Sequence, residues 1–344
     1  MNSHILVIRL SAMGDVAMTV PVLRVFAMAY PNVKITVLTR AAFKPFFKNI
    51  PNLEVFIADL NKSHKGLAGL YKLYRQIQSL SITHIADLHN VLRSKILLGF
   101  FTFSNIKMAI IDKGRAEKKA LTRERNKIFK PLKTTHQRYA DVFEKLGFPV
   151  DISQPVFPDK TILSEKILDL IGTDYNYWIG FAPFAKHPGK MYPLDLVKKV
   201  LKKLSENKNH KIILFGGGDK EQRELSKMAK LFNCTFSIAG KLSMEEELSL
   251  ISNLDLMVSM DSGNGHLAAM QGVKVISIWG VTHPYAGFAP YNQPIENQLI
   301  PDREKYPKLP CSVYGNKICE DYEDVMRDIS PKVVVEKINE VLEK

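Results

Sequence analysis

The stretch LDLMVSMDSGNGHLAAMQGVKVISIWG, residues 254–280, decides the fold class. Its apolar run Leu256–Ser259 predicts a strand, Gly265–Gln271 predicts a short helix, and Val273–Trp279 predicts a second strand. A strand, a helix and a strand in this order form a right-handed βαβ unit whose two strands are parallel. The stretch therefore predicts an α/β protein in which helices cover both faces of a parallel sheet.

The same alternation of strands and helices runs through both halves of the chain. The segment Asp151–Asp174, which carries proline and polar residues, predicts a linker between the halves. A helical pattern over Val16–Ala27 contains Pro21, which predicts a kink or a later helix start at that residue. The 344 residues suffice for about two domains of ~150 residues each. The other predicted strands are Ile5–Ile8, Lys34–Leu38, Glu54–Ile57, His84–Ala86, Trp178–Ala182 and Lys211–Phe215, and the other predicted helices are Pro193–Leu204, Glu221–Phe232, Met244–Ser252 and Lys332–Leu342.

The composition predicts a globular protein with an anionic partner. Hydrophobic residues make up 46% and charged residues 24% of the chain, which excludes a disordered or fibrous protein. The 48 Lys and Arg residues exceed the 35 Asp and Glu residues, so the formal net charge is +13. Such a charge favours nucleic acid, a phosphorylated metabolite or an acidic membrane surface as the partner.

The ends, apolar runs and cysteines predict a soluble cytoplasmic protein. The N-terminus has only four apolar residues before Arg9, too few for a signal-peptide core of ~7–15 residues. The longest apolar run, Ile96–Phe103, is far shorter than the ~20 residues that span a bilayer. The three cysteines, Cys234, Cys311 and Cys319, cannot form a fully paired framework, which favours a reducing compartment.

The loop MDSGNGHLAAMQG, residues 260–272, is the strongest local signal for a binding site. Its serine and glycines place backbone N–H groups at a helix start, which favours an anion such as a pyrophosphate. The alternative is an ordinary capped helix, with Asp261 or Ser262 as the N-cap and His266 packed in the first turn. The candidate residues of this loop are Asp261, Ser262, Gly263, Gly265 and His266.

Three more loops follow predicted strands of the second half. A threonine hydroxyl there suits a phosphate, a carboxylate suits ribose hydroxyls, and lysines are mobile point charges suited to phosphate. Each loop alone is equally well explained as a turn, a strand–helix connection or solvent-exposed lysines. Because ligands of such sheets bind at the carboxyl ends of the strands, the four loops together indicate one phosphorylated ligand. The candidates are Thr282 in WGVTHPYAGFAP (279–290), Glu221 in GGGDKE (216–221), and Lys186 and Lys190 in PFAKHPGKMYP (183–193).

The loop RLSAMGDVAM, residues 9–18, follows the first predicted strand and carries Asp15. A carboxylate at the end of a strand can accept a proton from a hydroxyl nucleophile. The alternative is that Asp15 caps the following helix. The loop does not match GxGxxG, and the chain has no GxxxxGK[ST], HExxH or paired CxxC motif. We therefore expect neither a dinucleotide oxidoreductase nor a metal site.

The segment Lys107–Arg138 concentrates the positive charge of the chain. It holds eleven Lys or Arg and three Asp or Glu, a net charge of +8. It is either a solvated mobile loop or a binding surface for phosphate groups. Few aromatic residues interleave the basic ones, with Phe129 and Tyr139 the exceptions, which weakens a nucleic-acid interpretation.

Taken together, the motifs resemble a known enzyme family. RLSAMGDVAMTVPVL near the start, Lys190 before the pair Tyr192–Pro193, MDSGNGHLAA and WGVTHPYAG occur in this order. They resemble the ADP-heptose:lipopolysaccharide heptosyltransferases, glycosyltransferase family 9, over nearly the whole chain. Family members often have a proline after DSG and the turn GPT, where this chain has Asn264 and Val281.

The resemblance implies a GT-B fold, in which two Rossmann-like domains with parallel sheets face each other across a cleft. An acceptor-binding domain over residues 1–155 and a nucleotide-sugar domain over 175–328 are expected, with a helix over 329–344 crossing back to the first domain. Asp15 matches the general base of the family. Lys118, Lys119, Arg123 and Arg125 fall in its acceptor-side region. The donor-side matches are Lys190, Glu221, Asp261, Ser262, Gly263 and His266, and the loop candidates Lys186 and Thr282 complete the expected donor site.

The resemblance further implies an inverting, metal-independent transfer of heptose from ADP-heptose, without a cofactor, to a lipopolysaccharide inner-core or lipid A-type acceptor. The expected partners are the nucleotide-sugar donor, a phosphorylated glycolipid and an anionic membrane surface, but no nucleic acid. The expected location is the inner face of the cytoplasmic membrane. The alternatives are another nucleotide-sugar transferase or an epimerase of the same fold and, from a different class, a basic nucleic-acid-binding protein without enzymatic activity.

Overall fold

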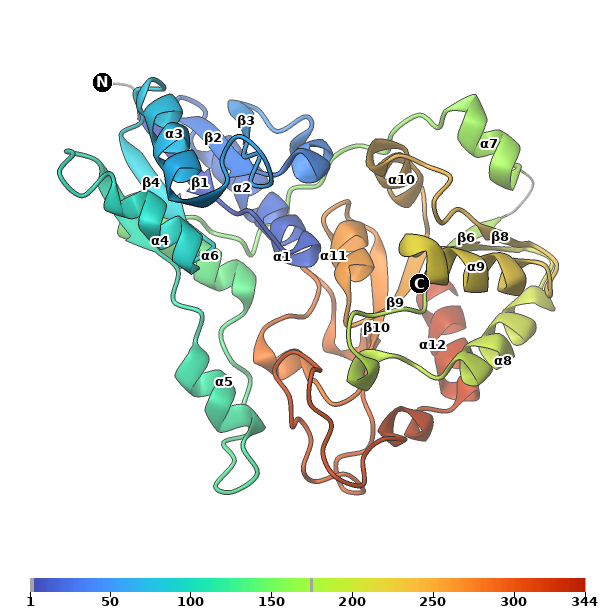
Figure 1. Ribbon diagram of the computed structural model, residues 1–344. Helices are drawn as coiled ribbons and strands as arrows, with labels where there is room; N and C mark the ends of the chain where they lie inside the picture. Colours follow the sequence, from blue (N-terminus) through green and yellow to red (C-terminus); the bar gives the residue numbers. More distant parts are fainter. Residues whose placement is uncertain (1–2, 174–175, 344) are drawn as a thin grey trace. The chain divides into compact units, whose positions relative to one another are not determined.

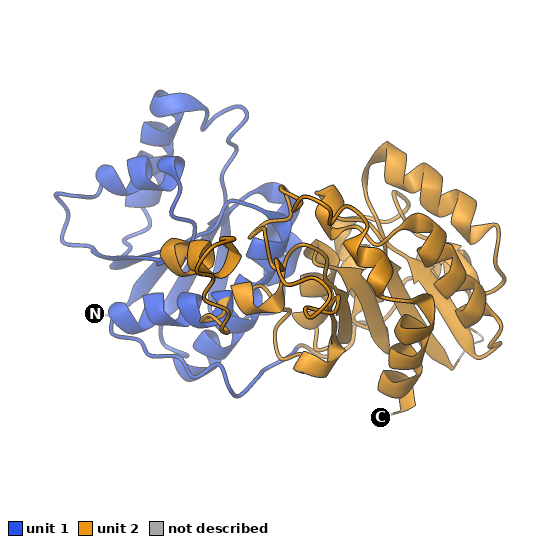
Figure 2. Cartoon of the chain, turned by 90° about the horizontal axis from the view of Figure 1, so that it is seen from below, with its two compact units in different colours: residues 1–113, 135–157 blue, residues 114–134, 158–344 orange. Residues whose placement is uncertain are grey.

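The computed structural model describes residues 3–173 and 176–343, which divide into two compact units (Figure 1). Unit 1 comprises Met1–Lys113 and Thr135–Phe157, and unit 2 comprises Gly114–Thr134 and Pro158–Lys344 (Figure 2). Each unit is a parallel sheet covered by helices on both faces, so the α/β class expected from the sequence is confirmed.

Unit 1 contains a five-stranded parallel sheet in the order β3-β2-β1-β4-β5. Helices α3 and α4 bury Leu70, Leu73 and Leu97 on one face of this sheet. Helices α2 and α6 pack together over the other face, where the rings of Phe26 and Phe143 lie 4.8 Å apart. The strands are β1 His4–Ile8, β2 Lys34–Thr39, β3 Leu53–Ile57, β4 His84–Asp87 and β5 Lys107–Ile110, and the helices are α1 Met13–Ala17, α2 Thr19–Ala29, α3 Gly66–Gln78, α4 Leu92–Gly99 and α6 Thr135–Lys145.

Unit 2 contains a six-stranded parallel sheet in the order β11-β10-β9-β6-β7-β8. Helices α8, α9 and α12 contribute to the apolar core of the unit, and α11 packs on β9 and β10. The strands are β6 Tyr177–Ala182, β7 His210–Leu214, β8 Thr235–Ser237, β9 Leu256–Met260, β10 Lys274–Ile278 and β11 Gln298–Leu299. The helices are α5 Arg115–Thr122, α7 Glu165–Ile171, α8 Leu194–Ser205, α9 Gly218–Ala229, α10 Met244–Ile251, α11 Gly263–Ala269 and α12 Pro331–Glu343.

The strand orders fix where each unit can bind a ligand. In unit 1 the order reverses between β1 and β4, and in unit 2 it reverses between β6 and β9. Ligands of open α/β sheets bind outside the carboxyl ends of the strands at such a reversal. The loops that follow β1, β4, β6 and β9 are therefore the ones in which a site is expected.

Several boundaries differ from those expected from the sequence. The helical pattern over Val16–Ala27 is two helices, α1 and α2, with Pro21 in the first turn of α2, where a missing N–H costs little. The linker expected over Asp151–Asp174 contains helix α7, and Asp174 itself lies outside the described residues. Helix α9 begins at Gly218 rather than Glu221.

Two segments belong to unit 2. The last helix, α12, packs on α8, β9 and β10 of that unit, because its buried Val334, Ile338 and Val341 form an apolar stripe against that core. Residues 114–134 belong to unit 2 although the expected first domain included them.

Two of the three cysteines are paired, although the sequence favoured a reducing compartment. Cys311 and Cys319 form a disulfide with a Cα–Cα distance of 6.0 Å, and Cys234 is free. The pair has a sequence separation of 8 along a segment without helix or strand, so the disulfide closes a short loop. Within the described residues, no helix is long and apolar enough to cross a membrane.

Candidate active site

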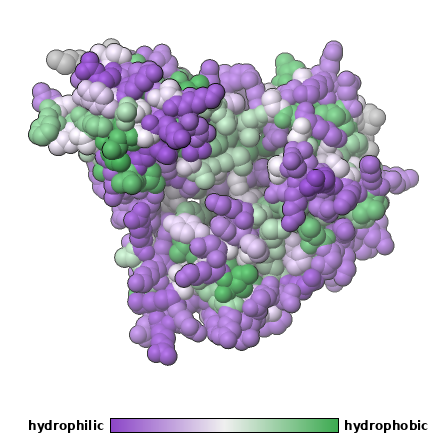
Figure 3. Space-filling view, viewed as in Figure 1, coloured by the Kyte–Doolittle hydropathy of each residue, from purple (hydrophilic) through white to green (hydrophobic). Residues whose placement is uncertain are grey.

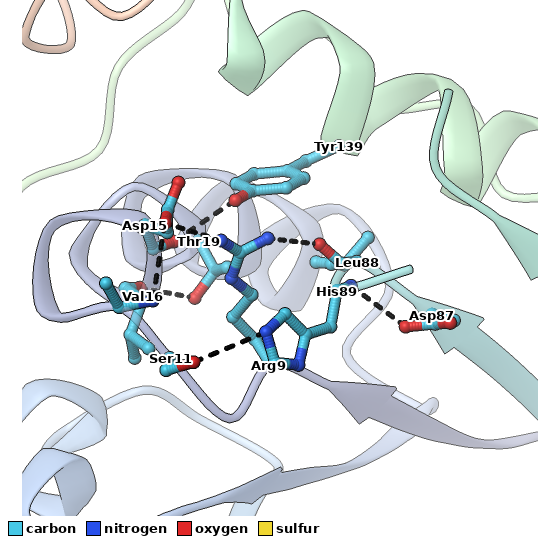
Figure 4. Close-up of polar contacts among 10 residues, drawn as sticks. Arg9, Ser11, Asp15, Val16, Thr19, Asp87, Leu88, His89 and Tyr139 are labelled. Carbon is cyan, nitrogen blue, oxygen red and sulfur yellow. Dashed lines mark hydrogen bonds and ion pairs between the residues drawn. The ribbon is translucent and has the colours of Figure 1, made fainter. Parts of the chain in front are cut away.

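The first cluster of polar side chains lies at the strand reversal of unit 1 and is centred on Asp15 (Figure 4). The Oδ2 atom of Asp15 lies 2.7 Å from a guanidinium nitrogen of Arg9, which is the residue after β1. The same oxygen accepts a hydrogen bond of 3.3 Å from the backbone N–H of Ala12. Asp15 therefore caps its own helix weakly, and its stronger partner is Arg9.

Arg9 is buried and holds the carboxylate of Asp15 in place. Its other terminal nitrogen donates a hydrogen bond of 2.6 Å to the carbonyl of Leu88, in the loop after β4. The ring of Tyr139 faces the guanidinium at 5.9 Å, and the Tyr139 hydroxyl donates to the Asp15 carbonyl at 3.2 Å. The side chain of Arg9 is 6% exposed and that of Asp15 is 32% exposed. The pair thus presents its carboxylate, and not its cation, to solvent.

His89 completes the cluster from the loop after β4. Its Nε2 lies 3.4 Å from the Ser11 hydroxyl, and its backbone N–H donates to the buried carboxylate of Asp87 at 2.9 Å. Burial and the nearby Arg9 lower the pKa of His89 to about 3, so the ring is neutral near pH 7. A neutral imidazole and a carboxylate are the groups that accept protons or orient a hydroxyl. Sequence analysis did not single out Arg9, His89 or Tyr139, although Arg9 is part of the motif that carried the resemblance.

The second cluster lies at the strand reversal of unit 2 and brings together Lys190, Asp261 and Thr282. The Lys190 ammonium lies 2.9 Å from Asp261 Oδ2, which also accepts a hydrogen bond of 2.9 Å from the Thr282 hydroxyl. These residues follow β6, β9 and β10, respectively. The side chain of Lys190 is 15% exposed and that of Asp261 is 7% exposed. Here the cation is the more accessible member of the pair, as an anion-binding group should be.

Close packing of two loops holds this second cluster together. The Val281 N–H donates to the Gly189 carbonyl at 3.0 Å, so the loops after β6 and β10 run side by side. A Cβ at Gly280 would overlap the Gly189 carbonyl, which explains the glycine at the start of the GVT turn. The disulfide loop lies against the same place, because the Cys311 N–H donates to the Val281 carbonyl and a Cβ at Gly315 would overlap the Lys190 side chain.

The remaining donor-side candidates take different positions. Ser262 is the N-cap residue of α11, and Gly263 is its first residue, but the Ser262 hydroxyl makes no capping hydrogen bond. His266 is buried within α11. Lys186 is exposed. Glu221 accepts a hydrogen bond of 2.9 Å from the Gly217 N–H, so its carboxylate stabilises the start of α9.

The acceptor-side candidates lie in unit 2. Lys118 is 5% exposed, and its ammonium lies 3.9 Å from the centroid of the Phe288 ring. Lys119, Arg123 and Arg125 are exposed. The charge pattern of this segment did not reveal that part of it packs on the loop that carries Thr282.

Phe129 is the main anchor of that segment, which we call the inserted segment, Gly114–Thr134. The Arg303 guanidinium stacks 3.3 Å from the centroid of the Phe129 ring, and the rings of His283 and Tyr285 lie 5.0 and 4.9 Å away. Burial, with Arg303 and Lys127 nearby, lowers the pKa of His283 to about 4.

Lys127 fixes the inserted segment at a second point. Its ammonium donates a hydrogen bond of 2.7 Å to the carbonyl of Pro310. Burial lowers the pKa of Lys127 to about 8. Among the residues that the structure describes, no group of three or more His, Cys, Asp or Glu residues is arranged to hold a metal ion.

Comparison with known proteins shows which family of enzymes this chain resembles. Residues 70–317 match the model of glycosyltransferase family 9 (heptosyltransferase). The lipooligosaccharide heptosyltransferase 2 of Haemophilus influenzae is 28% identical over 99% of this chain and 100% of its own length.

Two solved structures share the fold along almost the whole chain. One is the family 9 glycosyltransferase of Veillonella parvula, with a TM-score of 0.76, 19% identity, and coverage of 99% of this chain and 98% of that one. The other is the Escherichia coli heptosyltransferase WaaC with ADP, with a TM-score of 0.68, 19% identity, and coverage of 98% and 99%. The GT-B fold expected from the sequence is thereby confirmed.

Proposed function

This chain belongs to glycosyltransferase family 9, and from that membership we propose that it transfers a heptose from ADP-heptose to a lipopolysaccharide inner-core or lipid A-type acceptor. Relatives with this activity in their names, and a solved neighbour described with an ADP-heptose analogue, support the proposal. The observation that carries it is the pair of clusters at the two strand reversals, one presenting a carboxylate and the other a cation.

Asp15 serves as the general base in the proposed reaction. It takes the proton of the acceptor hydroxyl while that oxygen attacks the anomeric carbon of the donor from the side opposite the leaving diphosphate, so the transfer inverts the anomeric configuration. Arg9 and the Ala12 N–H hold Oδ2 of the carboxylate in a fixed place. A base positioned in this way contributes ~10²–10⁴-fold to a rate.

Lys190 stabilises the leaving diphosphate. Negative charge grows on that group as the bond to the sugar breaks, and a preorganised cation at that point lowers the barrier. Asp261 keeps the ammonium in position, and Thr282 orients Asp261. The proposed reaction needs no metal ion, because the lysine supplies the positive charge, and it consumes no cofactor besides the nucleotide-sugar.

The acceptor in this proposal is a phosphorylated glycolipid, and the enzyme works at the inner face of the cytoplasmic membrane. The excess of basic residues suits both the phosphorylated acceptor and an anionic membrane surface, and the proposal includes no nucleic-acid partner.

A transfer assay with purified protein tests the function. The protein is incubated with ADP-heptose and a lipid A-type acceptor in the presence of a metal chelator, and the product is followed by mass spectrometry and its anomeric configuration by NMR. We expect one added heptose with inverted configuration. Transfer from UDP- or GDP-sugars instead of ADP-heptose would contradict the donor assignment, and loss of transfer with chelator would contradict the metal-independent mechanism.

A further inference from the structure

The surface formed by α3, α4 and the turn after α4 in unit 1 exposes large apolar side chains. Leu67 and Tyr71 on α3 are 66% and 49% exposed, Leu92 at the start of α4 is 76% exposed, and Phe103 after α4 is fully exposed. Figure 3 shows hydrophobic residues gathered over α3 and α4 beside strongly hydrophilic ones. Contiguous apolar patches of this kind mark interaction sites, whereas single exposed residues do not. We call this the α3–α4 surface.

Direct ring contacts join α3 to the end of α4. Tyr71 and Tyr74 of α3 lie 5.6 and 5.5 Å, centroid to centroid, from Phe100 at the end of α4. Leu67 precedes Tyr71 by one helical turn and therefore lies on the same face of α3. The opposite faces of the two helices are buried in the core of unit 1, through Leu70, Leu73, Ile77, Leu97 and Leu98.

Within α3, α4 and the segment between them, the charged residues are almost all basic. Residues 61–111 contain seven Lys or Arg residues and a single acidic residue, Asp87, which is fully buried. At 100° per residue, Arg75 and Lys72 lie on the solvent-facing side of α3 next to Tyr71. On α4 the outward-facing Leu92 is flanked on its two sides by Arg93 and Lys95, all three of which are exposed.

We propose that the α3–α4 surface docks on an anionic lipid bilayer. Apolar side chains that insert among acyl chains, with Lys and Arg beside them to meet anionic headgroups, are the features of a helix that lies in a membrane interface. The absence of an exposed acidic group over residues 61–111 removes the repulsion that would oppose such docking. The rings of this surface alone would also suit nucleic-acid bases, but the exposed aliphatic Leu67 and Leu92 offer nothing for a base to stack on and suit acyl chains, so a bilayer fits the whole surface better than RNA or DNA.

This inference rests on the proposed function, since a glycolipid acceptor lies in such a bilayer, and it assigns the docking to unit 1. The basic residues 118–125 of the inserted segment are a poorer candidate. Lys118 is buried against Phe288, and the exposed Lys119, Arg123 and Arg125 have no exposed large apolar side chain among them.

A flotation assay with the full chain tests the inference. The wild type is mixed with vesicles of phosphatidylcholine alone or with phosphatidylglycerol added, and is compared with the variant Leu67→Ser, Lys72→Glu, Arg75→Glu, Phe103→Ser. The matched control variant is Lys160→Glu, Ile162→Ser, Lys230→Glu, Leu231→Ser, which changes equally exposed residue types of unit 2 by the same charge. We expect the wild type and the control to bind only the anionic vesicles, and the α3–α4 variant to bind them at least about tenfold more weakly.

Four results would overturn the inference: no binding of the wild type to anionic vesicles, wild-type binding by the α3–α4 variant, an equal loss in the control, or displacement from vesicles by single-stranded RNA. A second readout separates this inference from the proposed function. Heptose transfer to a water-soluble acceptor without acyl chains should be the same in the wild type and the α3–α4 variant. If vesicle binding behaves as expected but no protein transfers heptose to any acceptor, the proposed function fails and the docking surface stands.

Discussion

Individual residues show why the two clusters suit different tasks. Both contain a cation–carboxylate pair in which one member is nearly buried, Arg9 in unit 1 and Asp261 in unit 2. A buried charge must keep its partner, because an uncompensated one costs several kcal/mol. The pairing therefore fixes the more exposed members, Asp15 and Lys190. One is suited to take a proton and the other to hold a phosphate.

Replacing Lys190 should separate binding of the diphosphate from binding of the nucleoside. Lys190→Ala is expected to weaken ADP binding by about tenfold or more while leaving adenosine binding nearly unchanged, since a hydrogen bond to a charged group contributes ~1.5–3 kcal/mol. Isothermal titration with both ligands measures this. Lys202→Ala, which changes an exposed lysine of α8 in the same unit, is the matched control. Equal losses for ADP and adenosine would show that Lys190 acts only through the structure of the loop.

The buried His89 should make unit 1 less stable as the pH decreases. Its pKa is about 3 in the folded protein and near 6.5 when unfolded, so the unfolded chain binds the extra proton between these values. Stability is therefore complete above pH 6.5 and is lost as the pH falls, by up to about 2 kcal/mol at pH 5.

Urea unfolding of unit 1 at pH 7 and pH 5, followed by hydrogen exchange of its strands, checks this prediction. His89→Gln should show a smaller difference between the two pH values than the wild type, whatever its stability at pH 7. The same pH dependence in both proteins would mean that His89 is not the group that is protonated on unfolding.

The inserted segment is the element whose role the structure changes most. Its Phe129 contacts His283, the neighbour of Thr282, which in turn orients Asp261 beside Lys190. Arg303 closes the other side of the Phe129 ring. Residues far from the second cluster in the sequence thus support the loop that carries part of it.

Removing the Phe129 ring should therefore weaken donor binding. Aromatic and cation–π contacts contribute ~0.5–1.5 kcal/mol each, so Phe129→Ala is expected to raise the Kd for ADP by several-fold, up to about tenfold. Phe129→Tyr should restore it. The matched control is Ile128→Ala, which removes an exposed neighbour. The prediction is wrong if Phe129→Ala binds ADP as tightly as Ile128→Ala does.

At the scale of the whole molecule, the sequence predicted β1 to β4, β6, β7, β9 and β10 and the loops at their ends, but it did not predict β5, β8 or β11. Strands such as Leu256–Met260 are short apolar runs, buried along their whole length, which single-sequence patterns reveal well. Asp15, Lys190, Asp261 and Thr282 were found because each follows a strand that the pattern had already placed.

The parts that the sequence did not predict depend on contacts between distant residues. The basic residues of the inserted segment indicated a charged surface and not the packing role of Phe129, because the partners of this ring lie about 150–170 residues away along the chain. Nothing in the sequence around Arg9 or His89 indicates a site, because the two residues come together only where the neighbouring strands β1 and β4 end. The packing of α12 is another such contact: Val334 and Ile338 share an apolar core with residues of α8, about 130 residues earlier in the chain. The local sequence of α12 shows that it has an apolar face, but not which helix this face contacts.

The rate of heptose transfer by Asp15→Asn tests the central claim most directly. The variant keeps the size of the side chain and a hydrogen-bond acceptor for Arg9, but it removes the base. Turnover with ADP-heptose and acceptor should fall by ~10²–10⁴-fold, while the Kd for ADP, measured by titration, stays at the wild-type value because the donor cluster is in unit 2. Asp151→Asn, an exposed acidic residue of unit 1, should leave both quantities unchanged. An Asp15→Asn variant that keeps about half of the wild-type turnover would contradict the account, because a general base contributes far more than that.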